Sequence, residues 1–277
     1  MRSARFFLGI LGIFGLSLVP RLGSAADFES PRTAALGGAG RASPLLNDAI
    51  YLNPSFISFL PTSSVAANYS RLKQEGRNSN FSILDGRSEL FQAGVGYTLQ
   101  EDRRMVHFGG SRAIFERYGV GLGGKMLIPH GTGVQALWEY TLAMTALPWN
   151  NFQAALTIEN VRESARAREL GFYRSVQMGT KYNFEGLVLA YFDPHWTPHA
   201  RNPYGYGAGL EFPFFSDFFL RMGTFRNSRL TWLNDSANGY ASGVGWVAPK
   251  LSLDVAVQRV QSPVTTQVLL GGATIYF

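Results

Sequence analysis

The sequence predicts an all-β fold, a transmembrane antiparallel β-barrel of about fourteen strands, on three observations. The chain begins with an apparent export signal. Its 277 residues are 16% charged and 14% aromatic, with 31 glycines and no cysteine. From residue 62 to the end, apolar and polar residues alternate with the period of two that strands require. Few charges, many aromatic residues and alternating segments are typical of a barrel whose outside faces lipid.

The export signal reads MRSARFFLGILGIFGLSLVPRLGSAA, with Arg2 and Arg5 before an apolar run and small residues after it. This order predicts a signal peptide over residues 1–26, since the run of about 14 residues is shorter than the roughly 20 of a membrane-spanning helix. Its removal takes away three arginines and lowers the formal charge from +6 to about +3. The remaining basic residues are scattered, so we expect no nucleic-acid partner.

The alternation is clear in KLSLDVAVQRV (250–260), where leucines and valines share one face and Ser252, Asp254 and Gln258 lie on the other. Similar segments predict fourteen strands, with twelve as the alternative. The predicted ranges are 62–74, 78–84, 88–99, 103–112, 118–128, 133–146, 151–161, 170–183, 185–193, 204–213, 216–226, 239–248, 250–261 and 265–277.

The connections between these strands fall into two alternating sets. One set is short, as in FERY and LPWN, whereas the other contains 162–170, 193–203 and 227–238. Bacterial outer-membrane barrels have short periplasmic turns and longer extracellular loops. We therefore expect the three long loops to be extracellular. The final strand ends in Phe277, which resembles the signal read by the barrel assembly machinery.

Two short motifs do not fit their usual context. GVGLGGK (119–125) matches a phosphate-binding pattern, but Met126 continues a strand alternation where a helix would be needed. His195 and His199 flank Pro198, which argues against a helix that would bring them together. We expect no enzyme activity, no cofactor and no metal site. An outer-membrane phospholipase or protease is the alternative, although the four histidines lack a supporting context.

Several charged residues fall on the faces expected to point into the lumen. They can pair with one another and stiffen the barrel, or line a path for solutes. The opposite face should carry Trp138, Leu156, Val176 and Leu210 toward lipid. The candidate lumen-facing residues are Lys125, Glu139, Glu159, Lys181, Glu211, Arg221 and Asp254.

Residues 27–61 read DFESPRTAALGGAGRASPLLNDAIYLNPSFISFLP. This stretch resembles the N-terminal segment of FadL-like outer-membrane transport barrels. There, a GGAG sequence precedes an acidic-polar step, an apolar run and Asn-Pro-Ala; here Ser55 replaces the alanine. The matching residues are Gly37, Gly38, Gly40, Asp48, Asn53 and Pro54.

The resemblance implies that residues 27–61 fold inside a barrel of residues 62–277 as a plug. Pro54 should hold Asn53 in extended backbone. Apolar residues of 50–59 would fill the lumen, with room left by inward glycines. These glycines are Gly94, Gly96, Gly121, Gly123, Gly207 and Gly209.

The resemblance also implies a channel for hydrophobic small molecules such as fatty acids, with a wall gap expected in strands 118–128 or 204–213. The alternative is a plugged, non-conducting barrel that has a structural role or belongs to a secretion system. The expected partners are outer-membrane lipid, a hydrophobic ligand, the assembly machinery and a second copy of the chain.

Overall fold

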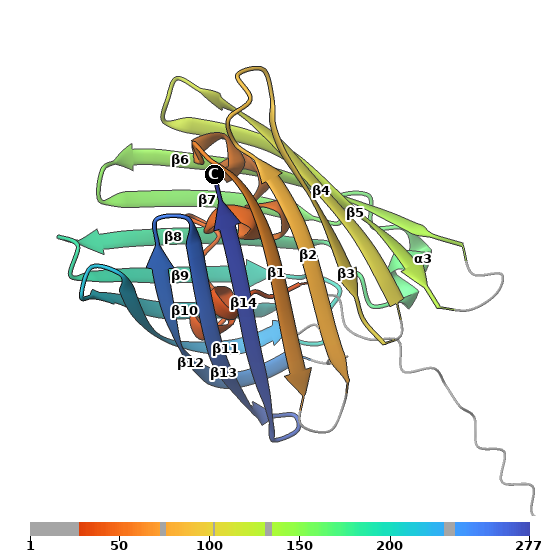
Figure 1. The fold of residues 1–277 in the computed structure, drawn as a ribbon. Helices are drawn as coiled ribbons and strands as arrows, with labels where there is room; N and C mark the ends of the chain where they lie inside the picture. The colour runs from red at the N-terminus through yellow and green to blue at the C-terminus, as the bar shows by residue number, and fades with distance from the viewer. Residues whose placement is uncertain (1–27, 73–75, 102, 131–134, 230–235) are drawn as a thin grey trace, which may run out of the picture.

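A computed structural model describes residues 28–72, 76–101, 103–130, 135–229 and 236–277. The predicted signal peptide of residues 1–26 lies outside the described residues. The chain forms a closed antiparallel barrel in which each strand pairs with its sequence neighbour and β1 pairs with β14 (Figure 1). The predicted fold class is confirmed.

All fourteen predicted strands are present. They are β1 (Ser63–Leu72), β2 (Arg77–Asp85), β3 (Gln92–Leu99), β4 (Arg103–Ile114), β5 (Tyr118–Pro129), β6 (Leu137–Trp149), β7 (Phe152–Glu159), β8 (Ser175–Phe184), β9 (Val188–Trp196), β10 (Tyr204–Phe214), β11 (Phe218–Arg229), β12 (Ser236–Ala248), β13 (Leu251–Ser262) and β14 (Thr266–Tyr276).

Several strand boundaries differ from the prediction. The strand expected from residue 170 begins at Ser175, because residues 170–171 form the turn after helix α3 (Ala165–Glu169) and residues 172–174 have no regular structure. Ser164 caps this helix by accepting a hydrogen bond from the Ala167 amide. The strand expected from residue 88 begins at Gln92, and β9 and β11 extend beyond their predicted ends. The long loops expected at 193–203 and 227–238 are correspondingly shorter.

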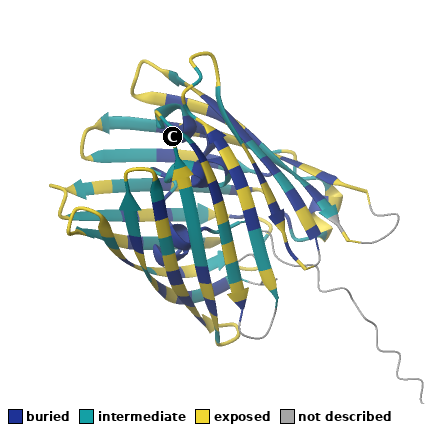
Figure 2. Ribbon diagram, in the orientation of Figure 1, coloured by how far each residue is buried: buried dark blue, intermediate teal, exposed yellow. Residues whose placement is uncertain are grey.

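Exposure alternates along the strands, which produces the banding in Figure 2. On the outer face, Trp138 is 50% exposed and Leu156 39%, while Val176 is half-buried. Leu210 is also exposed. The register predicted from the period of two therefore agrees with the structure, because a shift by one residue would exchange the two faces.

The N-terminal residues lie inside the barrel, drawn in red and orange behind β1 and β14 in Figure 1. We call residues 28–61 the plug. It contains α1 (Pro31–Ala35), α2 (Ala49–Leu52) and the 3-10 helices η1 (Leu46–Asp48) and η2 (Pro54–Phe59). Among the described residues, no helix has the length and apolarity needed to cross a membrane.

Glycines on the inner wall leave the space that the plug occupies. A β carbon at Gly209 would lie 2.8 Å from the Cα atom of Leu36, and one at Gly94 would meet the Ile50 side chain 2.6 Å away. All six glycines predicted to make room for the plug have plug atoms as their nearest neighbours. The wall gap expected in residues 118–128 or 204–213 is not found, because β5 and β10 pair continuously with both neighbours.

Candidate functional site: the plug, its cavity and the adjoining wall

The first turn of the plug begins at Ser30, whose hydroxyl accepts a hydrogen bond from the Thr33 amide and caps α1. Pro31 occupies the first helical turn, where its missing N–H costs nothing. After Leu36 the chain turns at Gly37, which has φ +68° and touches the backbone of Thr224 in β11. Any other residue at position 37 would have a strained backbone at this φ, and its β carbon would overlap the backbone of Thr224. This position therefore requires glycine.

A buried group of charges joins α1 to the wall. Arg32 donates to the Glu211 carboxylate at 3.2 and 3.3 Å and to the Tyr191 hydroxyl at 2.8 Å. Arg221 donates to the same carboxylate at 2.5 Å and also contacts Asp254. Removing one partner would leave a buried charge uncompensated, so these contacts hold the plug in one position.

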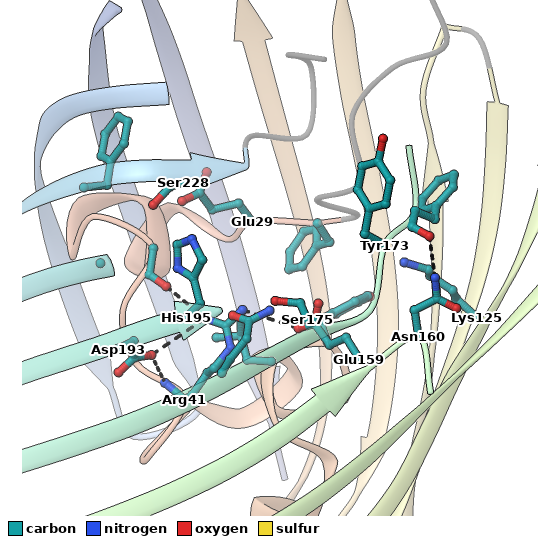
Figure 3. Close-up of a pocket in the computed structure, with 18 of the residues that line it drawn as sticks. Glu29, Arg41, Lys125, Glu159, Asn160, Tyr173, Ser175, Asp193, His195 and Ser228 are labelled. Carbon is teal, nitrogen blue, oxygen red and sulfur yellow. Dashed lines mark hydrogen bonds and ion pairs between the residues drawn. The ribbon is translucent and has the colours of Figure 1, made fainter. Parts of the chain in front are cut away.

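A second ionic contact lies after the Gly38-Ala39-Gly40 turn. One carboxylate oxygen of Asp193, on β9, accepts hydrogen bonds from the backbone amides of Gly40 and Arg41 at 2.9 and 2.8 Å. The Arg41 side chain lies 3.7 Å from Asp193 and 3.5 Å from Glu159 (Figure 3). The Arg41 side chain and two backbone amides thus join this turn of the plug to β7 and β9.

Asn53 links two parts of the plug to the wall. Its side-chain amide donates to the Arg41 carbonyl at 2.8 Å and to the Thr145 hydroxyl at 2.7 Å. Its carbonyl accepts from the backbone amide and hydroxyl of Ser55. The Asn53 backbone has φ −160° and ψ 88°, so it is not helical before Pro54, but its ψ is smaller than that of the extended backbone predicted.

A cavity of about 120 Å³ remains between the plug and the ends of the strands that carry the longer loops (Figure 3). Phe28, Phe172 and Phe225 line it together with several charged groups. Lys125 lies 2.7 Å from Glu139 and 4.8 Å from the ring centroid of Phe172. The lining is therefore both aromatic and charged, and each of its cations, Lys125 and Arg41, lies beside a lining carboxylate.

Two acids of the plug have altered proton affinity. Burial inside the barrel raises the pKa of Glu29 to about 7, partly offset by hydrogen bonds from Gln258 and by the charge of Arg41. Burial also raises the pKa of Asp48 to about 6, although Ser30 donates to its carboxylate at 2.6 Å. Both groups therefore change charge near neutral pH.

The described wall beside the cavity has two interruptions in its ladders, one between β11 and β12 at residues 225–228 and one between β8 and β9. Between β8 and β9, Gln177 pairs with His195 and Thr180 with Phe192, but the ladder leaves out Met178 and Gly179. In this register Pro194 lies opposite Met178 and Asp193 opposite Gly179, and Pro194 has no backbone N–H to donate.

The plug lies directly behind this interruption. A β carbon on Gly179 would lie 2.7 Å from the Ala42 nitrogen and 2.8 Å from the Arg41 Cβ. On the outer face, Met178 and Phe192 are about half exposed, at 54% and 48%. Plug residues 40–42 therefore cover the break between β8 and β9, which adjoins the cavity through Gln177, Asp193 and His195.

The structure places the predicted residues as follows. Gly37, Gly38, Gly40, Asp48, Asn53 and Pro54 all lie in the plug. Of the seven candidate lumen residues, Glu159, Lys181 and Glu211 contact the plug, whereas Lys125 pairs with Glu139 and Arg221 with Asp254. Sequence reasoning missed Arg32, Arg41 and Asp193. The inward-facing acids need positively charged partners, and a search for cations near the GGAG motif would have found Arg32 and Arg41.

The structure also places His195, His199 and the terminal residue, and of these His195 lines the cavity. His195 faces the Asn227 carbonyl at 3.1 Å, whereas His199 pairs with Glu163 at 2.7 Å, so the two histidines have different neighbours. Phe277 closes the barrel by exchanging backbone hydrogen bonds with Ser63 at 3.0 and 3.3 Å, and its side chain is exposed. Its role as an assembly signal stays a prediction.

No protein-family model matches the chain, and no curated protein matches it. Solved structures do. The Pseudomonas aeruginosa FadL homologue aligns with a TM-score of 0.67 at 11% identity, over 91% of this chain and 99% of its own. The Pseudomonas putida toluene transporter TodX aligns with a TM-score of 0.63 at 11% identity, over 91% of this chain and 98% of the TodX chain. The CymD monoaromatic hydrocarbon channel aligns with a TM-score of 0.63 at 12% identity, over 93% of this chain and 98% of the CymD chain.

The chain has the fold of the FadL family. At these identities the similarity concerns the fold and not the solute. Among these similar structures, TodX is a transporter and CymD is a channel. Another similar structure, the Acinetobacter baumannii outer membrane protein Omp33, aligns with a TM-score of 0.54 at 13% identity, over 78% of this chain and 98% of its own. A bacterial outer-membrane location is therefore supported at the level of the fold, while export by a signal peptide stays a prediction.

Proposed function

We propose that the protein is an outer-membrane channel for small hydrophobic molecules. One observation carries this proposal: the cavity lies where plug residues 40–42 cover the ladder break between β8 and β9. A solute that enters from the long-loop end would reach the cavity first. It would then leave sideways into the membrane when residues 40–42 withdraw from Gly179.

The size of the cavity favours compact solutes. Its volume of about 120 Å³ is close to that of a cavity of roughly 150 Å³ that binds benzene. Toluene and monoaromatic hydrocarbons, the solutes of TodX and CymD, are of this size. A fatty acid is a larger solute of the same class and would need a greater displacement of the plug.

The charged groups of the lining would not oppose such a solute. Lys125 already lies against the ring of Phe172, at a distance typical of a cation–π contact. An aromatic solute could take a similar position against Lys125 or Arg41. Each of these two cations lies beside a carboxylate, so neither presents an unbalanced positive charge to a solute.

A second function, a plugged barrel that conducts nothing, is favoured by the buried charges around Arg32. The Glu211 carboxylate forms ion pairs with both Arg32 and Arg221, and its side chain is only 4% exposed. A plug held by such contacts could be a permanent part of the wall.

Uptake by intact cells distinguishes the two functions. Cells that lack other channels of this fold would express the protein, and entry of labelled toluene and labelled oleate would be compared with an empty-vector strain. We expect faster toluene entry, and still faster entry for Asp193→Asn, which weakens the hold on Gly40 and Arg41. Asp85→Asn, an outward-facing acid at the opposite end, is the matched control and should equal the parent protein. Entry at the empty-vector rate for every correctly folded variant would support the non-conducting barrel.

A further inference from the structure

Among the residues of the described strands, the charges that point outward at the end with the longer loops are all positive. Six acids lie in the described strands, and all but Asp85 point toward the lumen. Arg71, Arg77 and Arg259, by contrast, point outward and are exposed. Asp85 lies at the opposite end of β2, so it cannot neutralise them.

These arginines lie on neighbouring strands. Strands β13, β14, β1 and β2 lie side by side at the front of Figure 1. Arg71 lies directly opposite Arg77 in the β1–β2 ladder, and like charges in this position destabilise a sheet. Arg259 lies on β13, opposite Gln267. None of the three guanidinium groups makes a hydrogen bond or ion pair with a residue in the described parts of the chain. A bound anion would remove their repulsion.

A surface hollow of about 340 Å³ adjoins Arg71, lined by Val257, Gln267, Val268 and Leu269. Leu269 lies opposite both Arg71 and Val257, so the apolar part of the hollow begins beside the charged part. Farther along the same outer face are Tyr69, Val255 and Leu253, all exposed. Cationic groups thus stand above an apolar surface on the side of the protein that faces lipid.

We propose that this hollow binds a phosphorylated glycolipid of the outer leaflet. A phosphate would be held by Arg71, Arg77 and Arg259, and an acyl chain would lie on Val257 and Leu269. Guanidinium groups suit phosphate because their N–H groups can bond two oxygens at once. The position on the lipid-facing wall favours a lipid over a soluble anion, since the apolar part of the hollow needs an apolar partner. The site requires the long-loop end to face the exterior, but it does not depend on which solute the channel carries.

Retention of lipid A by the purified, detergent-solubilised protein tests this proposal. Native mass spectrometry would measure bound lipid A for the parent protein and for the Arg71→Gln/Arg77→Gln/Arg259→Gln variant. We expect at least a tenfold loss of affinity in the variant. The matched control is Arg87→Gln/Arg112→Gln/Lys250→Gln, which removes three exposed cations near the opposite end and should bind as the parent does.

Two further probes separate the possible sources of the anion. Lipid A without phosphates should bind at least tenfold more weakly than lipid A, and inorganic phosphate should not compete at equal concentration. Equal retention by the parent protein and the triple variant, or competition by inorganic phosphate alone, would overturn the proposal. If the triple variant does not show the heat-modifiable gel shift of a folded barrel, Arg77→Gln alone should lose about threefold, and an unchanged affinity there would equally count against the site.

Discussion

At the scale of single residues, Asn53 connects three parts of the molecule. Its side chain reaches the Arg41 carbonyl, the Thr145 hydroxyl and Ser55, and none of it is exposed. No other residue type of similar size offers both a donor group and an acceptor group in this arrangement. The residue therefore positions η2 against the wall and at the same time holds the turn that carries Arg41.

Asn53→Ala should lower the free energy of unfolding by about 1–3 kcal/mol, because buried polar groups lose their partners. Urea unfolding of the barrel in detergent micelles measures the change. Asn151→Ala removes one exposed hydrogen bond to Tyr182 and serves as the control. A loss for Asn53→Ala no larger than that of the control would show that the amide does not anchor the plug.

The proton affinities of Glu29 and Asp48 predict that the plug docks more tightly in acid. Both pKa values, about 7 and about 6, are higher in the folded protein than the ordinary values of 4.5 and 3.8. The stabilising contribution is therefore complete below the ordinary values, and it is lost as pH rises through 6 to 7. The groups that face them are Arg41 and Gln258 for Glu29, and Arg32, Asp254, Ser30 and Thr33 for Asp48.

Single-channel recordings at pH 5 and pH 8 measure this effect. We expect more frequent openings at pH 8, and a weaker dependence on pH in the Glu29→Gln/Asp48→Asn variant. Glu89→Gln changes an exposed acid and should keep the dependence of the parent protein. Openings that become more frequent in acid would contradict the sign of the prediction.

At the scale of elements, the inner wall and the plug fit through backbone contacts. Leu36 lies against Gly209 and Gly223, and Pro54 lies against Gly109 and Gly123. The glycines lower stability, because they make the unfolded chain more flexible. Because glycine has no side chain, however, the short helices of the plug can approach the wall closely at these positions. Pro194 has the opposite effect on β9, where it leaves part of the ladder with β8 unpaired.

Gly209→Ala should destabilise the protein by about 1–3 kcal/mol, because the added methyl group overlaps the Leu36 backbone. Gly271→Ala is the matched control, since nothing lies within 4 Å of a β carbon there. Its effect should be within about 0.5 kcal/mol of zero. Thermal unfolding followed by the loss of heat modifiability compares the two. Similar losses would mean that Gly209 does not limit the approach of the plug.

At the scale of the whole molecule, the connections at one barrel end are longer. The segments 160–174 and 197–203 lie there, whereas the opposite end has turns such as 185–187 and 215–217. This asymmetry predicts which end faces the exterior. The outward arginines lie at the same end as the longer loops.

Labelling of intact cells tests this orientation. The chain has no cysteine, so a single introduced thiol is unique. Glu169→Cys, in α3, should react with a reagent that cannot cross the outer membrane. Asp217→Cys, in an exposed turn at the opposite end, should react only after the membrane is ruptured. The reverse pattern would invert the barrel and would place the proposed glycolipid site on the wrong leaflet.

The sequence by itself determined the number of strands, their inner and outer faces and the glycines that border the plug. These properties depend on local alternation, because successive side chains of a strand point to opposite faces. The inward position of Glu211, for example, follows from its place next to Leu210. The starts of β3 and β8 were less well predicted, because residues 88–91 and 170–174 alternate but lie in the connections before these strands.

Only the tertiary structure decided which charges meet. Arg32 and Glu211 are 179 residues apart, and their pairing depends on the path that the plug takes through the lumen. The same holds for Arg41 and Asp193, whose contact places residues 40–42 behind the break at Pro194. Such contacts form when the barrel closes around a folded segment. The local pattern of a strand or of the plug indicates only that a side chain faces a polar lumen. It does not indicate which charged residue that side chain will meet.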